Sequence, residues 1–194
     1  MNAKEYFSDL SRCLDGFEAR DERDRPLTQD LGFQLAIEWI RQVQKKNAKV
    51  IFVGNGGSAA IASHQAVDLW KNGGIRAMAF NDASLLTCLS NDFSYPEVFE
   101  KSVAMFADAA DVLIAISSSG KSPNILKAAE KARSLGCRVM TMSGFKPDNL
   151  LRRAGHLNFY APSDRYGMVE IAHLTLCHYI TDHFVSCAAK ASKK

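Results

Sequence analysis

Two glycine- and serine-rich stretches carry groups that can bind a ligand; the serine-rich one suits a phosphate, and the glycine-rich one lets the backbone approach a ligand, with Asn55 and Ser58 as polar contacts. Residues 54–58 read Gly-Asn-Gly-Gly-Ser, and residues 116–122 read Ile-Ser-Ser-Ser-Gly-Lys-Ser. Both follow an apolar run and precede a predicted helix, so their hydroxyl and backbone N–H groups lie at the positive end of a helix dipole. The stretch at 54–58 lacks the glycine spacing of dinucleotide sites and the lysine of nucleotide-binding loops. Each stretch alone also fits an ordinary tight turn that leads into a helix.

Two pairs of ionisable residues lie at helical spacing. His64 and Asp68 are four residues apart and therefore adjacent on one helix face. Glu170 and His178 are eight residues apart, just over two turns, on an apolar stripe of the predicted last helix. Such pairs serve as metal ligands, as a base with its orienting partner, or as surface hydrogen bonds. Two carboxylates and two imidazoles together suit Zn²⁺, but the sequence alone does not bring the two helices together.

Strands and helices alternate from Lys49 onward and would position these groups. Apolar runs predict strands at 50–53, 75–80, 112–116, 138–142 and 157–160. Helical patterns lie between and after them, at 59–70, 95–106, 123–135 and 165–187. Ser122 and Pro123 suit the N-cap and the first position of a helix. We predict a doubly wound, flavodoxin-like α/β fold with a five-stranded parallel sheet flanked by helices. Ligands of such folds bind at the carboxyl ends of the strands, where both stretches lie.

Two amphipathic helices precede the first strand. Apolar residues recur at three- and four-residue steps between Tyr6 and Phe17, and again after Thr28 up to about Lys46. A charged break at residues 20–26 separates them. Their apolar faces need a partner, either the flank of the domain or the same helices of another subunit, and we favour the subunit interface. The chain is thus predicted to be one domain over 1–194, with a helical oligomerisation arm at 1–47 and an α/β core at 48–194.

Composition excludes several classes of partner. The 194 residues are 47% hydrophobic and contain no Pro- or Gly-rich linker, as expected for one compact domain. A net charge of +3 is too small to indicate nucleic acid. Apolar runs of about five residues are too short to cross a membrane, and the first residues lack a signal peptide, so we expect a cytoplasmic protein. The cysteines are odd in number and widely spaced, which predicts reduced thiols; they are Cys13, Cys88, Cys137, Cys177 and Cys187.

Taken together, the motifs resemble the sugar isomerase (SIS) domain. They are Gly-Asn-Gly-Gly-Ser at 54–58, Ser-Asn-Asp-Phe at 90–93, Ile-Ser-Ser-Ser-Gly-Lys-Ser at 116–122 and the closing helix. The resemblance covers nearly all of the chain, including the two leading helices. Within the SIS domains, the Ser-Asn-Asp-Phe element and the position of His64 are similar to the sedoheptulose 7-phosphate isomerases, also called phosphoheptose isomerases.

The resemblance implies how a phosphorylated heptose would be bound. The serine loop would hold the phosphate through Ser117, Ser118, Ser119 and Ser122. The sugar chain would be lined by Asn55, Gly56, Gly57, Ser58, Asn91 and Asp92. The family's active sites are completed between the subunits of a homotetramer, which accords with the unpartnered apolar faces of the first two helices.

The resemblance also implies a proton transfer between C1 and C2 through an enediol. His64 and His178 match metal ligands of the family, whereas Asp68 stands where the family usually has Glu, and Glu170 where it usually has Gln. Asp68 or Glu170 would take the proton, and His178 would help to protonate the enediol oxygen. Zn²⁺ on His64, Asp68, Glu170 and His178 would stabilise the oxyanion. Aspartate is one methylene shorter than glutamate, and a misplacement of about 1 Å can lower a rate on the order of 10²-fold.

The expected activity is therefore an aldose-ketose isomerisation of sedoheptulose 7-phosphate to D-glycero-D-manno-heptose 7-phosphate, in the biosynthesis of heptose for products such as lipopolysaccharide. Two alternatives stay open. The changed carboxylates at Asp68 and Glu170 are consistent with a different sugar phosphate. Other relatives of the family are non-catalytic regulators that bind a phosphosugar or a protein, but the retention of two histidines and two carboxylates argues against that role.

Overall fold

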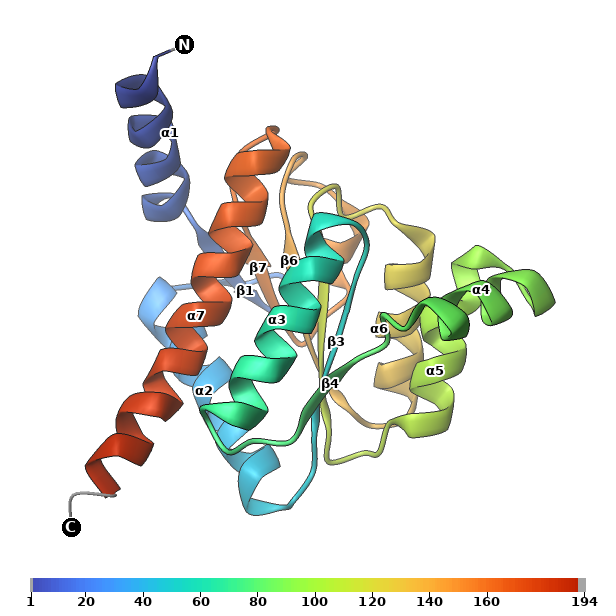
Figure 1. Cartoon of the computed structure of the whole chain (residues 1–194). Coiled ribbons are helices and arrows are strands. Elements are labelled where there is room, and N and C mark those ends of the chain that lie inside the picture. The colour runs from blue at the N-terminus through green and yellow to red at the C-terminus, as the bar shows by residue number, and fades with distance from the viewer. Residues whose placement is uncertain (1, 192–194) are drawn as a thin grey trace.

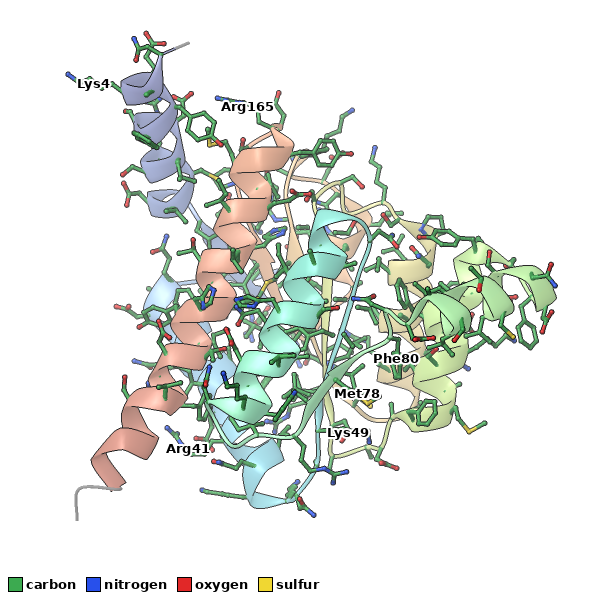
Figure 2. All side chains as sticks on the ribbon, viewed as in Figure 1. Lys4, Arg41, Lys49, Met78, Phe80 and Arg165 are labelled. Carbon is green, nitrogen blue, oxygen red and sulfur yellow. The ribbon has the colours of Figure 1, made fainter. Side chains whose placement is uncertain are left out.

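A seven-stranded sheet lies between two layers of helices in the computed structural model, which describes residues 2–191 and the side chains of residues 2–186 (Figure 1). The strands are β1 Glu18–Asp21, β2 Pro26–Leu27, β3 Val50–Gly54, β4 Ala77–Ala79, β5 Val112–Ser117, β6 Arg138–Ser143 and β7 Leu157–Tyr160. The helices are α1 Ala3–Asp15, α2 Gln29–Lys45, α3 Gly57–Lys71, α4 Ala83–Asp92, α5 Val98–Phe106, α6 Pro123–Ser134 and α7 Tyr166–Ala191. Two 3-10 turns complete them, η1 Tyr95–Glu97 and η2 Leu150–Arg153.

The strand order is β2-β1-β7-β6-β5-β3-β4. The five strands from β7 to β4 are parallel, which confirms the α/β class with a mainly parallel sheet. The prediction of only five strands was wrong, because β1 joins β7 and β2 joins β1, both antiparallel. These two strands occupy the segment that was expected to be a charged break. β2 is the edge strand and has only two residues, β1 carries three charged residues, and Ala19 is the one fully buried residue of the two strands, so no alternating pattern marked them.

The sheet separates two apolar cores. Val50 and Phe52 of β3 point into a core formed with α2, α3 and α7, whereas Ile51 and Val53 point into a core formed with α5 and α6. A strand that is covered on both faces is apolar at every position, which is why β3 and β5 stand out in the sequence. Figure 1 shows α3 and α7 side by side in front of the sheet, with their amino-terminal ends at the same edge.

The region around residues 83–106 differs from the prediction of one helix over 95–106. α5 begins only at Val98, after the turn η1, which contains Pro96. A separate helix, α4, precedes it and starts at Asp82, whose carboxylate accepts the N–H of Leu85 at 3.0 Å. α4 has no fully buried residue; Leu85, Leu86 and Leu89 are half-buried and pack against the core, which is too short an apolar pattern to have marked the helix. In Figure 1 it projects away from the sheet.

None of the helices formed by the described residues is both long enough and apolar enough to cross a membrane. Four cysteines are free thiols, Cys13, Cys88, Cys137 and Cys177. The side chain of Cys187 lies outside the described residues.

A buried carboxylate ties the starts of β3 and β5 together. Asp111 is 1% exposed and accepts the backbone N–H groups of Lys49 and Asp108, at 2.9 and 2.8 Å. The Lys49 ammonium lies 2.6 Å from Asp111 and 2.9 Å from Asp108. Burial alone would lower the pKa of Lys49, but the hydrogen bonds to Asp111 and Asp108 raise it above its ordinary value. These contacts of Asp111 with Lys49 and Asp108, which we call the clamp, fix the register of the two strands that carry the candidate site.

We expect Asp111→Ala to lower the free energy of unfolding by about 3 kcal/mol, because it leaves a mostly buried ammonium and two N–H groups without their main partner. Urea unfolding measures this change. Asp108→Ala is the matched control, since Asp108 is 82% exposed and contacts the same ammonium; we expect it to change stability by less than about 1 kcal/mol. Equal effects of the two substitutions would show that the clamp does not stabilise the fold.

Candidate active site

A polar cavity of about 250 Å³ lies at the carboxyl edge of the sheet, where β3 and β5 lead into α3 and α6. Both glycine- and serine-rich stretches line it, together with the first turns of α7. The lining residues are Asn55, Gly56, Gly57, Ser58, Ile116, Ser117, Ser118, Ser119, Ser122, Tyr166 and Glu170. Eight of the ten residues that were predicted to bind substrate are therefore in one place.

The serine loop owes its shape to Gly120. This residue has φ +63, a conformation that favours glycine, and its N–H donates to Ser117 O at 3.0 Å. A β-carbon there would overlap the side chain of Asn149. Asn149 is itself buried and donates to Ser143 Oγ at 3.2 Å and to the Gly144 carbonyl at 3.1 Å. The loop is thus held from behind by the segment that follows β6.

A buried imidazole completes this support. His173 is fully buried and its Nε2 lies 3.1 Å from the Ser143 carbonyl. Burial lowers the pKa of His173 to about 4, although the hydrogen bond to Ser143 opposes this, so the ring is neutral at pH 7. Ser143 pairs with Ser117 across β5 and β6. His173 therefore belongs to the scaffold under the loop and does not line the cavity.

One hydroxyl of the loop, that of Ser118, is left free to bind a ligand. Ser122 occupies the N-cap position of α6, as predicted, but its side chain does not cap the helix; it lies 3.2 Å from Ser117 Oγ. The hydroxyl of Ser118 is buried and has no hydrogen-bond partner among the described residues. Because buried polar groups normally have partners, this hydroxyl is suited to a ligand that offers an acceptor. A phosphate supplies such acceptor oxygens.

The helix α3 also begins without a side-chain cap. Its N-cap residue is Gly56, at φ +54 and ψ −122. Just beyond it, the carboxylate of Glu170 lies so close to Gly57 that any β-carbon at position 57 would overlap it. Glu170 is half-buried, and no hydrogen bond or ion pair holds it within the described part of the chain. The cavity therefore joins the serine loop to one carboxylate that has no partner among the described residues.

Three of the four predicted metal ligands form a separate cluster. His64 Nε2 lies 3.3 Å and His178 Nδ1 lies 3.9 Å from Asp68 Oδ2. The three ligand atoms lie within 4.8 Å of one another, so two imidazole nitrogens and a carboxylate oxygen converge as zinc ligands do. This arrangement would hold a divalent cation between α3 and α7.

Glu170 does not join that cluster. Eight residues along α7 correspond to about 12 Å between Glu170 and His178, and eleven residues along α3 to about 16 Å between Gly57 and Asp68. Bonds to zinc are about 2 Å long. The expectation of one site made of His64, Asp68, Glu170 and His178 is therefore not met within one chain. Residues two turns apart lie on the same face of a helix, but they are too far apart to bind one ion.

Asn91 and Asp92 also lie outside the cavity. Both are exposed at the end of α4, where Asn91 donates to Asp92 at 2.9 Å. The structure instead adds residues that the sequence did not single out. Tyr166 lines the cavity from the start of α7, and its ring packs edge-on against Phe145. Ile116 lines it from the end of β5; only their places at the ends of elements could have marked them.

The chain matches the family model described as "SIS domain" over residues 6–144. A phosphoheptose isomerase of Pelobacter propionicus is 34% identical over 163 residues, which cover 81% of this chain and 83% of that protein. A phosphoheptose isomerase of Helicobacter pylori is 35% identical over 144 residues, with 71% and 74% covered. The solved phosphoheptose isomerase of Neisseria gonorrhoeae superposes with a TM-score of 0.79 at 28% identity, and 93% and 96% of the two chains are covered.

We expect Ser118→Ala to weaken the binding of inorganic phosphate about tenfold, because a hydrogen bond to a charged acceptor is lost. Stability should change by less than about 0.5 kcal/mol, since the hydroxyl has no hydrogen-bond partner among the described residues. Isothermal titration and urea unfolding measure the two quantities. Ser134→Ala, at the far end of α6, is the control and should change neither. Unchanged phosphate affinity in Ser118→Ala would contradict the phosphate cradle.

Proposed function

The chain belongs to the SIS-domain family and to its phosphoheptose isomerases, and on that basis we propose that it converts sedoheptulose 7-phosphate to D-glycero-D-manno-heptose 7-phosphate. The observation that carries this proposal is the cavity in which the free hydroxyl of Ser118 and the carboxylate of Glu170 face the same space. An aldose-ketose isomerase needs both elements: an anchor for the phosphate and a base for the carbon-bound proton.

The phosphate cradle would supply binding energy far from the reacting carbons. Hydroxyls and backbone N–H groups of the serine loop hold the phosphate, and this remote contact positions C1 and C2. Glu170 then takes the proton that moves between these carbons. We assign the base to Glu170 and not to Asp68, because Glu170 lines the cavity without a partner, whereas Asp68 lies between two imidazoles. Protonation of the enediol oxygen is the role that we propose for His178.

The cluster of His64, Asp68 and His178 fits Zn²⁺ by its donor set and by the convergence of its ligand atoms. When bound there, the ion would supply a positive charge for an oxygen that becomes negative in the reaction. A carboxylate that ligates a metal is a poorer base, which again favours Glu170 as the proton acceptor. His64 and His178 hold Asp68 in place in either case.

We further propose a homotetramer whose active sites are completed between subunits. Asn91, Asp92 and the His64, Asp68, His178 cluster lie outside the cavity of their own chain, although the family resemblance implies roles for all of them. Contributions from a neighbouring subunit would reconcile these positions. We place the enzyme in the cytoplasm, in agreement with its free thiols, and in the biosynthesis of heptose for lipopolysaccharide.

A second candidate is the isomerisation of a different sugar phosphate. Glu170 stands where the family usually has Gln, and the structure places its carboxylate in the cavity. A negative charge there changes which substrate groups are favoured near the start of α3. The candidate keeps the same fold, the same phosphate cradle and the same proton transfer, and differs only in the sugar.

We expect the protein to convert sedoheptulose 7-phosphate to the aldoheptose phosphate. NMR measures this conversion in two samples, one with added zinc and one treated with a chelator. Loss of turnover on chelation would identify the His64, Asp68, His178 cluster as a working metal site, and unchanged turnover would leave Glu170 to act without a metal. Binding without turnover in either condition would contradict the proposed reaction. Screening other sugar phosphates would then separate a changed substrate from a non-catalytic binding protein.

Mixing two inactive variants tests the shared site. If Glu170 and His178 of different chains form one site, co-assembly of Glu170→Ala with His178→Ala gives an intact pair in about a quarter of the sites, and activity returns to about that fraction of the wild-type value. Sedimentation confirms that the mixed sample is a tetramer. If activity does not return in such a tetramer, the two residues do not meet across subunits.

A further inference from the structure

The side chain of Asn55 is held by a chain of hydrogen bonds that starts from the backbone of α6. Asn124 Oδ1 accepts the N–H of Ile125 at 3.0 Å, and a backbone N–H can only donate. This fixes which end of the Asn124 amide is oxygen. Asn124 is 1% exposed, so its amide has no solvent to turn toward.

The Asn124 amide in turn fixes the Asn55 amide. Asn55 Nδ2 donates to Asn124 Oδ1 at 2.9 Å, and Asn124 Nδ2 donates to Asn55 Oδ1 at 2.9 Å. From the other side, the hydroxyl of Tyr95 donates to the same Asn55 oxygen at 2.9 Å. Three separate elements therefore meet at one side chain: the end of β3, the start of α6 and the turn η1.

Counting donors and acceptors shows what Asn55 has left for a ligand. Its Oδ1 has two acceptor positions, and Asn124 and Tyr95 use both. Its Nδ2 carries two hydrogens, and one of them is used by Asn124. One N–H remains on a residue that lines the cavity. Asn55 is thus set to donate to a ligand oxygen and cannot accept from a ligand hydroxyl.

We propose that Tyr95 and Asn124 are positioning residues that hold Asn55 as a donor to an oxygen of the sugar. The inference rests on the proposed function, because it takes the sugar chain to lie next to Asn55. A donor that is fixed before the substrate binds stabilises an oxygen that gains negative charge, as the carbonyl oxygen does when a proton leaves the adjacent carbon. Without its two partners, the Asn55 amide could rotate and present its oxygen instead.

Tyr95 offers the sharper test, since it contributes little to the core. Its side chain is 53% exposed, and the turn η1 has no buried residue. Its hydroxyl reaches the cavity only through Asn55. Tyr95→Phe therefore removes one hydrogen bond to Asn55 and leaves the ring, the fold and the serine loop as they are.

We expect Tyr95→Phe to lower kcat/KM for sedoheptulose 7-phosphate about three- to tenfold, as the loss of one hydrogen bond does. The dissociation constant of inorganic phosphate should stay within about twofold, because the serine loop is untouched. In an Asn55→Ala background, Tyr95→Phe should have no further effect. Asn55→Asp, which keeps the acceptor and loses the donor, should be at least as impaired as Asn55→Ala. Tyr6→Phe, on α1, is the control tyrosine and should match the wild type.

Each result of this cycle decides the inference. The inference is overturned if Tyr95→Phe lowers kcat/KM equally in the wild-type and the Asn55→Ala backgrounds. It is also overturned if Tyr95→Phe weakens the binding of inorganic phosphate by the same factor as it lowers kcat/KM. An active Tyr95→Phe variant with wild-type kcat/KM would overturn it while the proposed function stands. If the wild-type chain neither turns over nor binds sedoheptulose 7-phosphate, the proposed function fails first. If the wild-type chain binds sedoheptulose 7-phosphate without turnover, the same mutant cycle is measured with the dissociation constant of the sugar phosphate in place of kcat/KM.

Discussion

Two helices that start without a side-chain cap determine what this protein can bind. α3 and α6 both begin at the carboxyl edge of the sheet, and in neither helix does the side chain of the N-cap residue bond to an N–H group of the first turn. A missing cap costs typically about 1 kcal/mol, and a buried hydroxyl without a partner, as in Ser118, adds to that cost. Ser118 and the first residues of α3, Gly57 and Ser58, line the same cavity. An anion there would satisfy them together, which explains why the local rules of helix capping are broken at this edge.

Buried, hydrogen-bonded residues hold the polar groups of the cavity in fixed positions. Asn149 fills the space that a β-carbon at Gly120 would need, and the buried, neutral His173 holds the strand end behind it. On the other side, Asn124 is locked by the backbone of α6. The polar groups that face the ligand are therefore backed by side chains that are themselves buried and hydrogen-bonded. Such support fixes donor positions before a ligand arrives, so little reorganisation is needed on binding.

The sequence predicted the parts of the fold that leave a periodic or compositional signal. β3 and β5 are buried on both faces, so their continuous apolar runs were detectable, and the loops after them were recognisable from glycine and serine. Strands β1 and β2 and helix α4 were missed because Ala19 is the one fully buried residue among them. The contact of Tyr95 with Asn55 spans 40 residues and depends on how η1 packs on the sheet. No local pattern could have revealed it.

The largest difference between the sequence-based prediction and the structure concerns the predicted metal ligands. Spacing along a helix shows which residues share a face, and by that criterion Glu170 and His178 belong together. The structure separates them by two turns and pairs each with a different part of α3: Glu170 with Gly57 at its start, and His178 with Asp68 near its end. A carboxylate beside the phosphate cradle can act on a bound sugar, whereas the cluster is too far along the helix to reach the same atoms from the same chain. The chemistry of the proposed reaction is thus divided between two places on one helix pair, and a subunit that presents its α3 and α7 to the cavity of another would reunite them.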